Sequence, residues 1–379
     1  MKRGPLFVTR PLLPPLAEFM PYLEEIWKSG WVTNSGAFHQ QLEAALAEYL
    51  AVPYISLVTN GTIALIVALR AQGVSGEVIT TPYSFVATAH ALKWSGIEPV
   101  FVDIDRDTLT LNPNLIEAAI TPRTSAILAV HVYGYPCHTN NIEELAQRHG
   151  LKVIYDAAHA FGVRDAGGSI LRHGDLSVLS FHATKPFHTF EGGAIVCHDV
   201  DMKRQIDHLK NFGFLNETAV TETGINGKMN ELQAAFGLLH LRHLDEAMEQ
   251  RAAVDAFYRR KLADVPGVQL LPRPRVQRFN FGYFPILIQG DAPLDRDGLF
   301  AVLRSQGIMV RRYFYPLITD FPMYRDHRGA SEANLPVARQ TAGKVLCLPI
   351  YPQLTDNDCH CVVDSIRVAM AASASGLGR

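Results

Sequence analysis

The 379-residue chain lacks the features that mark secreted, membrane-spanning or nucleic-acid-binding proteins. Its five cysteines are odd in number and scattered, which indicates reduced thiols and no disulfide framework. No stretch approaches the ~20 apolar residues of a membrane helix, and the apolar N-terminal stretch is broken at Pro5, Pro11, Pro14 and Pro15, unlike a signal peptide. The formal net charge of -2 provides no strong field for nucleic acid or an anionic membrane. We therefore expect a cytoplasmic protein that binds neither.

One short sequence, Cys359-His360-Cys361, looks like a metal-ligand cluster. Adjacent side chains on a helix or strand point in different directions, and no second pair of ligands lies nearby with the spacing of a zinc site. We expect ordinary helix residues here and no metal.

Apolar residues are plentiful, at 48% of the chain against 19% charged residues, which is typical of a globular protein with a large core. Between residues 54 and 197, apolar strand-like segments alternate with helical patterns. The candidate strands are 54–58, 77–80, 99–104, 126–131, 153–155, 176–181 and 194–197. Such alternation predicts an α/β fold in which helices cover both faces of a mainly parallel sheet.

The pattern changes toward the C-terminus. A long helical stretch at 229–262 is followed by a proline-rich segment, by strands near 281–288 and 345–348, and by helices near 295–306 and 356–371. We predict a large domain of residues 1–245, which includes helices near 17–28 and 37–50, and a smaller α+β domain of residues 246–379.

Three features fall where open parallel sheets bind ligands, at the carboxyl ends of strands. In Thr59-Asn60-Gly61-Thr62, Gly61 permits close approach of the backbone, and the following helix offers free amides to a phosphate. An ordinary turn would have the same sequence. Asp156 ends a buried strand, where a carboxylate is costly unless it meets a cation such as a protonated pyridine nitrogen; an N-cap is the alternative.

The third feature is Lys185, in a short loop between two apolar strands and shortly before Gly192-Gly193. Most lysines are solvated surface residues. A buried lysine with a lowered pKa, however, is the usual carrier of an imine and can also shuttle protons.

Six segments, in chain order, resemble the DegT/StrS-type sugar aminotransferases, a branch of the fold-type I pyridoxal-phosphate enzymes. They are TNGTIAL, TTPYSFVATAHAL, IYDAAHAFG, SFHATKPFHTFEGGAIV, GINGKMNELQAAFG and LPIYPQLT. Asn60 stands where serine is commoner in the family. The resemblance implies a large domain with a mainly parallel seven-stranded sheet flanked by helices, and a smaller C-terminal α+β domain.

The resemblance also implies residue roles around the cofactor, pyridoxal 5'-phosphate. Lys185 would bond the cofactor as an imine, Asp156 would pair with its ring nitrogen, and His159 would lie near its phenolic oxygen. Phe85 would stack on the ring, Gly61, Thr62 and Ser180 would hold the phosphate, and Asn226 would reach the phosphate of the neighbouring subunit, in a homodimer with shared sites. Core packing for Phe85, a structural role for His159 and a turn role for Asn226 are the alternatives.

The implied reaction is a ping-pong transamination in which glutamate gives its nitrogen to a nucleotide-linked keto sugar, as in amino sugar synthesis for lipopolysaccharide O-antigen. Phe-His-Ala-Thr-Lys followed by Glu-Gly-Gly resembles family members that aminate C4 of dTDP-4-keto-6-deoxyglucose. His182, Arg311, Arg312, Tyr313 and Tyr315 are candidates for substrate contact, since arginine suits phosphates and tyrosine offers a ring and a hydroxyl. The alternatives are a structural role for His182 and a surface loop for the other four residues.

Other readings stay open. A 3-keto or UDP-linked sugar could be the acceptor, and a cofactor-binding regulator without turnover could share the scaffold, although no appended DNA-binding domain is visible. Family members that dehydrate sugars carry histidine in place of the lysine, so Lys185 favours the transaminase branch.

Overall fold

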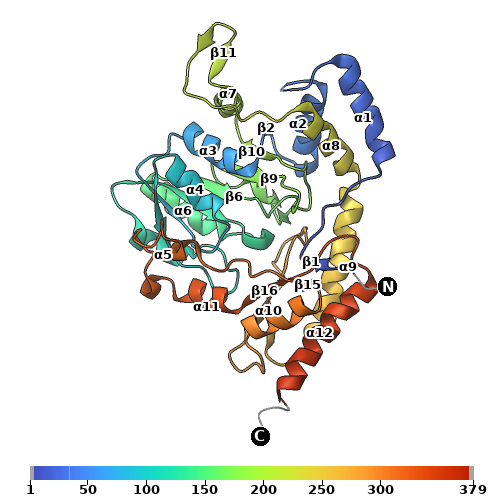
Figure 1. The fold of residues 1–379 in the computed structure, drawn as a ribbon. Helices are drawn as coiled ribbons and strands as arrows, with labels where there is room; N and C mark the ends of the chain where they lie inside the picture. The colour runs from blue at the N-terminus through green and yellow to red at the C-terminus, as the bar shows by residue number, and fades with distance from the viewer. Residues whose placement is uncertain (1–3, 34, 375–379) are drawn as a thin grey trace.

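The computed structural model describes residues 4–33 and 35–374 and builds them around a seven-stranded sheet with the order β2-β10-β9-β6-β5-β3-β4 (Figure 1). The strands are β2 (Tyr54–Val58), β3 (Glu77–Thr80), β4 (Glu98–Phe101), β5 (Thr124–Val130), β6 (Lys152–Asp156), β9 (Leu176–Ser180) and β10 (Gly193–Cys197). β10 runs antiparallel to β2 and β9, and the other neighbours are parallel. The predicted mainly parallel α/β sheet is confirmed.

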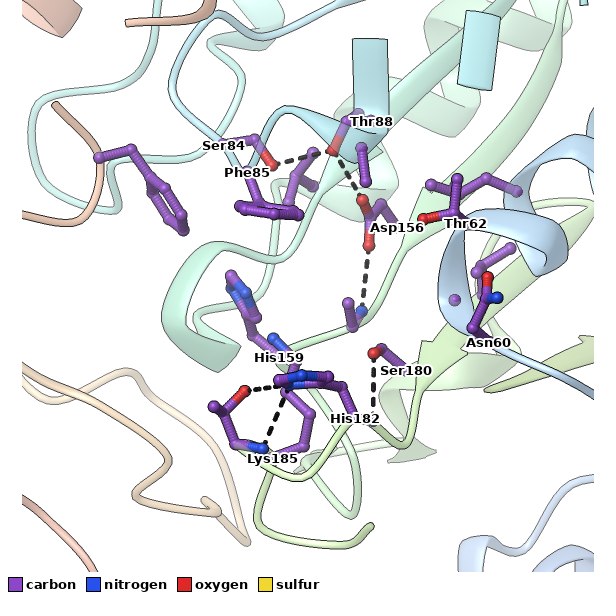
Figure 2. Close-up of a pocket in the computed structure, with 18 of the residues that line it drawn as sticks. Asn60, Thr62, Ser84, Phe85, Thr88, Asp156, His159, Ser180, His182 and Lys185 are labelled. Atoms are coloured by element: carbon purple, nitrogen blue, oxygen red, sulfur yellow. Dashed lines mark hydrogen bonds between the residues drawn. The ribbon is translucent and has the colours of Figure 1, made fainter. Parts of the chain in front are cut away.

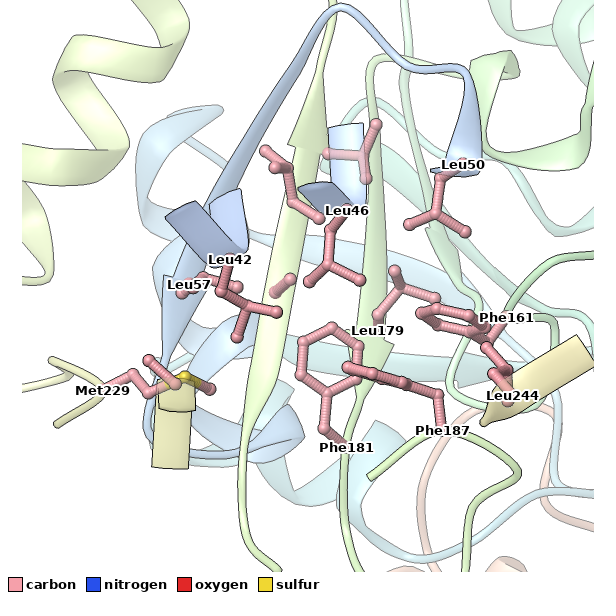
Figure 3. Close-up of a cluster of buried hydrophobic side chains, with 14 of the residues drawn as sticks. Leu42, Leu46, Leu50, Leu57, Phe161, Leu179, Phe181, Phe187, Met229 and Leu244 are labelled. Carbon is pink, nitrogen blue, oxygen red and sulfur yellow. The ribbon is translucent and has the colours of Figure 1, made fainter. Parts of the chain in front are cut away.

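Helices cover both faces of this sheet, because successive strand side chains point to opposite sides. One layer contains α3 (Gly61–Ala71), α4 (Ala87–Trp94) and α7 (Val200–Leu209), and the other contains α2 (Ala37–Leu50), α6 (Thr139–His149) and α8 (Glu231–Arg242). In β2, Val58 packs toward the first layer and Leu57 toward the second. Figure 3 shows the hydrophobic core between the sheet and this second layer, in which Leu42 and Leu46 of α2 pack with Leu179 and Phe181.

A smaller antiparallel sheet follows, with the order β13-β14-β16. It consists of β13 (Val268–Leu270), β14 (Phe284–Ile288) and β16 (Val345–Leu348), and packs with α10 (Arg296–Ser305) and α12 (Asp356–Ala374). The long helix α9 (Leu244–Leu262) joins the two parts: Leu244 and Met248 belong to the core of the large sheet, and Tyr258 and Leu262 to that of the small one.

The remaining elements are short or lie at the periphery. They are α1 (Leu16–Ser29), α5 (Pro113–Ile116), α11 (Pro336–Lys344), the strand pairs β1 (Leu6–Phe7) with β15 (Ile308–Met309), β7 (Arg164–Asp165) with β8 (Gly168–Ser169), and β11 (Phe214–Asn216) with β12 (Ala219–Val220), and five 3₁₀ turns: η1 (Glu117–Ala119), η2 (Val132–Gly134), η3 (Ile170–Arg172), η4 (Ile318–Asp320) and η5 (Glu332–Asn334). No helix in the described part of the chain is long and apolar enough to cross a membrane.

Several sequence predictions differ from these bounds. The helical stretch predicted at 229–262 is two helices, α8 and α9, which meet at His243. Helix α7 was not predicted, although Met202, Ile206 and Leu209 follow one another at helical spacing and pack on the core. Cys359 is buried in the core of the small sheet, while His360 lies against the Phe257 ring at 4.8 Å between centroids.

Two buried carboxylates cap helices from far along the chain. Glu231 accepts hydrogen bonds from the amides of Phe38 (3.0 Å) and His39 (2.7 Å) at the start of α2. Asp103, which follows β4, accepts them from the amides of Val337 and Ala338, both at 2.8 Å, at the start of α11. Because helix N-termini leave amides unsatisfied, these contacts hold α8 on α2 and the C-terminal part on the large sheet.

Buried histidines make the fold sensitive to acid. His240 in α8 is fully buried beside His188, and neither of its ring nitrogens has a hydrogen-bond partner among the described residues. Burial lowers the pKa of His240 to about 2 and that of His188 to about 4. The unfolded chain takes up these protons near pH 6.5. Stability is therefore complete above that pH and falls as the pH drops below it.

We expect His240→Phe to reduce this loss. At pH 5 a histidine that stays neutral when folded costs about 2 kcal/mol relative to neutral pH, and phenylalanine, of similar shape, has no proton to take up. Denaturant unfolding at pH 7.5 and 5.0 measures the difference. His198→Phe, at an exposed position, is the control and should keep the wild-type loss. Equal losses in wild type and His240→Phe would contradict the prediction.

Candidate active site

A cavity of about 520 Å³ opens at the carboxyl ends of β2, β3, β6 and β9 (Figure 2). Its lining combines loops of the large sheet with a segment near the small one. The polar and aromatic lining residues are Asn60, Thr62, Ser84, Phe85, Thr88, Asp156, His159, Ser180, His182, Thr184, Lys185, Glu191, Tyr283, Tyr313 and Phe314. This is where open parallel sheets bind ligands.

The turn before α3 forms an anion-binding corner of the cavity. The Asn60 side chain caps the helix by accepting a hydrogen bond from the Ile63 amide at 2.9 Å. The amides of Gly61 and Thr62 have no partner among the described residues and remain available at the helix N-terminus. A Cβ on Gly61 would lie 2.9 Å from Cβ of Ser180, so glycine is needed for β9 to come this close.

Asp156, the last residue of β6, carries a buried carboxylate at the centre of the cavity. Oδ2 accepts a hydrogen bond from the Thr88 hydroxyl at 2.8 Å, and Oδ1 accepts one from the Ala158 amide at 3.1 Å. No described Lys, Arg or His forms an ion pair with it. Burial raises the pKa of the carboxyl, and these hydrogen bonds and Lys185 only partly oppose the rise. The carboxylate therefore favours a cationic ligand.

The protonation of His159 follows from its surroundings. Its Nδ1 accepts a hydrogen bond from the Tyr133 amide at 3.1 Å, which leaves the proton of the neutral ring on Nε2. Tyr133 adopts a left-handed backbone conformation (φ 56°), which is strained for a residue with a side chain. Burial holds the pKa of His159 well below its usual value. His159 is therefore a neutral ring that donates from Nε2.

Lys185 lies in the loop between β9 and β10, with its amide bonded to the carbonyl of His182 at 2.8 Å. Its Nζ donates a hydrogen bond to Oη of Tyr283 at 3.1 Å. Burial lowers the pKa of the amine to about 8, and the negative charge of Asp156 opposes part of that effect. At pH 7 roughly a tenth of the amine is then neutral and able to attack a carbonyl, far more than for an ordinary lysine.

The rim of the cavity is polar. His182 Nδ1 lies 2.8 Å from Thr184 Oγ1, and its Nε2 lies 3.7 Å from the Glu191 carboxylate. Phe85 is 60% exposed and lines the cavity, which argues against the alternative of a core residue.

The structure gathers most of the site residues predicted from the sequence, but not all. Asn226 is exposed and pairs through its backbone with Asn211. Arg311 pairs through its backbone with Cys347, and Tyr315 lies under the Arg296 guanidinium. These predicted residues do not line the cavity, whereas Tyr313 does. Arg312 is occupied by Asp297 at 2.9 Å.

Three residues that contribute to the site were not predicted from the sequence. Tyr283 lies 98 residues from Lys185 along the chain, and no local pattern connects them. Tyr133 acts through its backbone amide, which leaves no compositional signal. Thr88 lies within the recognised segment TTPYSFVATAHAL. It stands four residues after Ser84, to which it is hydrogen bonded at 2.9 Å, and this spacing was the sequence signal that could have predicted its place in the site.

These groups fit pyridoxal phosphate. The carboxylate of Asp156 lacks a cation and suits a protonated pyridine nitrogen. The free amides of Gly61 and Thr62 suit the phosphate. Lys185 offers an amine to the aldehyde, and His159 Nε2–H offers a donor to the phenolic oxygen.

Comparison with known proteins supports the same conclusion. The model of the DegT/DnrJ/EryC1/StrS aminotransferase family matches residues 16–367. The dTDP-4-amino-4,6-dideoxy-D-glucose transaminase of Shigella dysenteriae is 56% identical over 363 residues, which cover 96% of this chain and 98% of that one. Its namesake from Escherichia coli is 52% identical over 350 residues, covering 92% and 94%. The solved structure of DesI in the presence of its TDP-sugar product has a TM-score of 0.93 and 36% identity, covering 99% and 95%.

We expect borohydride reduction in the presence of pyridoxal phosphate to attach the cofactor to Lys185, because this amine lines the cavity and burial lowers its pKa to about 8. Peptide mass spectrometry locates the adduct, and Lys185→Ala should abolish it. Lys228→Ala is the matched control: burial also lowers the pKa of Lys228, but this residue stacks on Phe212, outside the cavity lining. An adduct that persists in Lys185→Ala would contradict the assignment.

Proposed function

As this chain belongs to the DegT/DnrJ/EryC1/StrS aminotransferase family, it is a pyridoxal-phosphate aminotransferase of nucleotide sugars, and we propose that glutamate donates the amino group. The acceptor is dTDP-4-keto-6-deoxyglucose, and the product is dTDP-4-amino-4,6-dideoxyglucose. The observation that carries this proposal is that Lys185, whose amine has a pKa lowered to about 8 by burial, shares one cavity with the Asp156 carboxylate, which forms no ion pair with a described residue. The 56% identical relative that bears the product's name supports the choice of sugar.

Bound pyridoxal phosphate supplies an electron-accepting ring that carries nitrogen between the two substrates. The chain's own residues do the rest. Asp156 keeps the ring nitrogen protonated from its buried position, and His159 donates Nε2–H toward the phenolic side. Lys185 Nζ takes a proton from the substrate carbon and returns one, which its lowered pKa permits near pH 7.

We propose that the corner formed by Gly61, Thr62 and Ser180 binds the cofactor phosphate. Phe85 covers the ring from the exposed side of the cavity, as its position on the loop between β3 and α4 suggests. Helix amides suit this task because their partial positive charge needs no proton and does not change during the reaction.

The sugar enters over the polar rim of His182, Thr184, Glu191 and Tyr313. Hydroxyl groups of a hexose can exchange hydrogen bonds with these side chains. Exposed Arg311 and Tyr315, just outside the lining, remain our candidates for the nucleotide diphosphate, since arginine binds phosphate and tyrosine stacks.

A second copy of the chain completes the site in this proposal. The β11–β12 hairpin projects from the body of the molecule (Figure 1) and exposes Phe214, Leu215 and Val220. Such apolar surface is typical of an interface. Asn226 is hydrogen bonded through its backbone near the base of this hairpin and is exposed. We propose a symmetric homodimer in which Asn226 of each subunit reaches the phosphate corner of the other.

Substrate choice is tested with the purified protein, glutamate and a panel of nucleotide keto sugars, read by mass spectrometry. We expect turnover of dTDP-4-keto-6-deoxyglucose to exceed that of its 3-keto isomer and of UDP-linked 4-keto sugars by at least about tenfold, because a misplaced carbonyl loses alignment with Lys185. Efficient amination of the 3-keto isomer, without amination of the 4-keto sugar, would refute the C4 assignment.

Subunit complementation tests the shared site. We expect Asn226→Asp to lose cofactor affinity roughly tenfold or more, because a carboxylate repels phosphate, and Lys185→Ala to be inactive. Coexpressed as heterodimers, the two variants should recover activity, since one site then combines an intact Lys185 with an intact Asn226. Absence of recovery, with heterodimers verified by mass, would count against sharing.

A further inference from the structure

The Lys185 amine has one hydrogen-bond partner among the described residues, the hydroxyl of Tyr283 at 3.1 Å. Tyr283 also lines the cavity, and its ring lies 5.7 Å from Nζ, measured to the centroid. The Tyr283 hydroxyl is therefore the one group among the described residues that can fix the position of the Lys185 amine by a hydrogen bond.

The position of Tyr283 is set by a buried clip. Asn280, fully buried, donates hydrogen bonds to the carbonyls of His159 (2.8 Å) and Phe161 (3.0 Å). Its Oδ1 accepts one from the Gly282 amide at 3.1 Å. The clip holds the chain leading into β14 against the loop after β6. Tyr283 thereby contacts both Lys185 and His159, and its ring centroid lies 4.7 Å from that of His159.

Neighbouring aromatic rings fix the orientation of Tyr283. Tyr133 lies 5.6 Å away and Tyr313 6.0 Å away, measured between ring centroids. Burial raises the pKa of the Tyr283 hydroxyl far above neutrality. The hydroxyl thus stays protonated and acts as a hydrogen-bond partner, never as an anion that would pair with the lysine.

We propose that Tyr283 is a positioning residue, which holds the free Lys185 amine close to the substrate carbon between its two proton transfers. The inference rests on the proposed transamination. A lysine stem has four flexible carbons, and an amine without a fixed partner would sample many rotamers. Proton transfer is sensitive to displacements of about 1 Å. One hydroxyl at the right place therefore affects rate more than affinity.

The test compares Tyr283→Phe, which keeps the ring and removes Oη, with Tyr135→Phe. The control tyrosine is buried and donates to the carbonyl of Pro272 at 2.9 Å, outside the cavity lining. Each full-length protein is loaded with pyridoxamine phosphate, which leaves Lys185 free. Competitive labelling with acetic anhydride across pH, read on the Lys185 peptide, then measures its apparent pKa. The rates of the half-reactions with glutamate and with the keto sugar are followed by absorbance.

For Tyr283→Phe we expect the labelling midpoint to fall by about one pH unit, because the ammonium form loses its hydrogen-bond acceptor. Both half-reactions should slow by about 10- to 100-fold, with unchanged KM, cofactor content and Tm. Tyr135→Phe should match wild type in the labelling midpoint and in both rates. The proposal would be overturned if Tyr283→Phe kept the labelling midpoint and the rates of wild type. It would also be overturned if the slower rates came with lost cofactor or a lowered Tm, because that result indicates a structural role.

The two readouts separate this proposal from the function on which it rests. Labelling needs no substrate, so it reports on the contact between Tyr283 and Lys185 even if wild type does not react with glutamate. If wild type turns over no keto sugar while the labelling midpoint of Tyr283→Phe is shifted, the proposed reaction is refuted and the contact between Tyr283 and Lys185 is supported. Turnover by wild type, with an unshifted midpoint and unchanged rates in the variant, refutes the positioning role alone.

Discussion

The cavity depends on a carboxylate buried without a cation. Asp156 ends a central parallel strand and is 5% exposed, and its two hydrogen-bond donors, Thr88 and the Ala158 amide, carry no full charge. Burying a lone carboxylate costs several kcal/mol, which explains why its pKa is raised. Its hydrogen bonds and the charge of Lys185 offset this cost only in part. A ring with a protonated nitrogen removes it, so the arrangement selects for a cationic heterocycle and against a neutral one.

The same low-dielectric surroundings shift the pKa values of the other titratable groups in the cavity, and all of these shifts favour the neutral forms. Burial lowers the pKa of Lys185 and of His159 while it raises that of Asp156, so each group is pushed toward its neutral form. Asp156 and Lys185 partly restore each other's charge. A bound cationic ring would satisfy Asp156 and reduce its support for the ammonium form of Lys185. Cofactor binding and the readiness of the lysine to act as a base are therefore linked through one carboxylate.

How far the sequence predicts this molecule depends on how local each feature is. The strands at 54–58 and 77–80 have the predicted bounds, because a run of buried residues between turns is a local signal. Lys185, Asp156 and Gly61, which line the cavity, could be singled out because each lies at or just after the end of a strand and belongs to a recognisable motif. Tyr283 was not found, nor was the Tyr133 amide that sets the tautomer of His159, since both act through contacts between distant segments. Arg311 and Tyr315 show the opposite case: suitable residue types do not ensure a place in the cavity lining.

The distant contacts have a common origin in how the C-terminal part meets the large sheet. Asp103 caps α11, Asn280 clips the approach to β14 onto the loop after β6, and the Tyr133 hydroxyl donates to the carbonyl of Tyr313. The Asn280 and Tyr133 bonds join loops at the carboxyl edge of the sheet to the segments that carry Tyr283 and Tyr313, and the Asp103 bonds fix α11 of the same C-terminal part. Lys185 thus lies in one part of the chain, and the residue that we propose to position it lies in another. Because Lys185 and Tyr283 must stay in contact, a change far from the cavity that loosens this junction should reduce the rate of proton transfer before it reduces cofactor binding, since the residues that we propose for the phosphate and the ring nitrogen lie on loops of the large sheet.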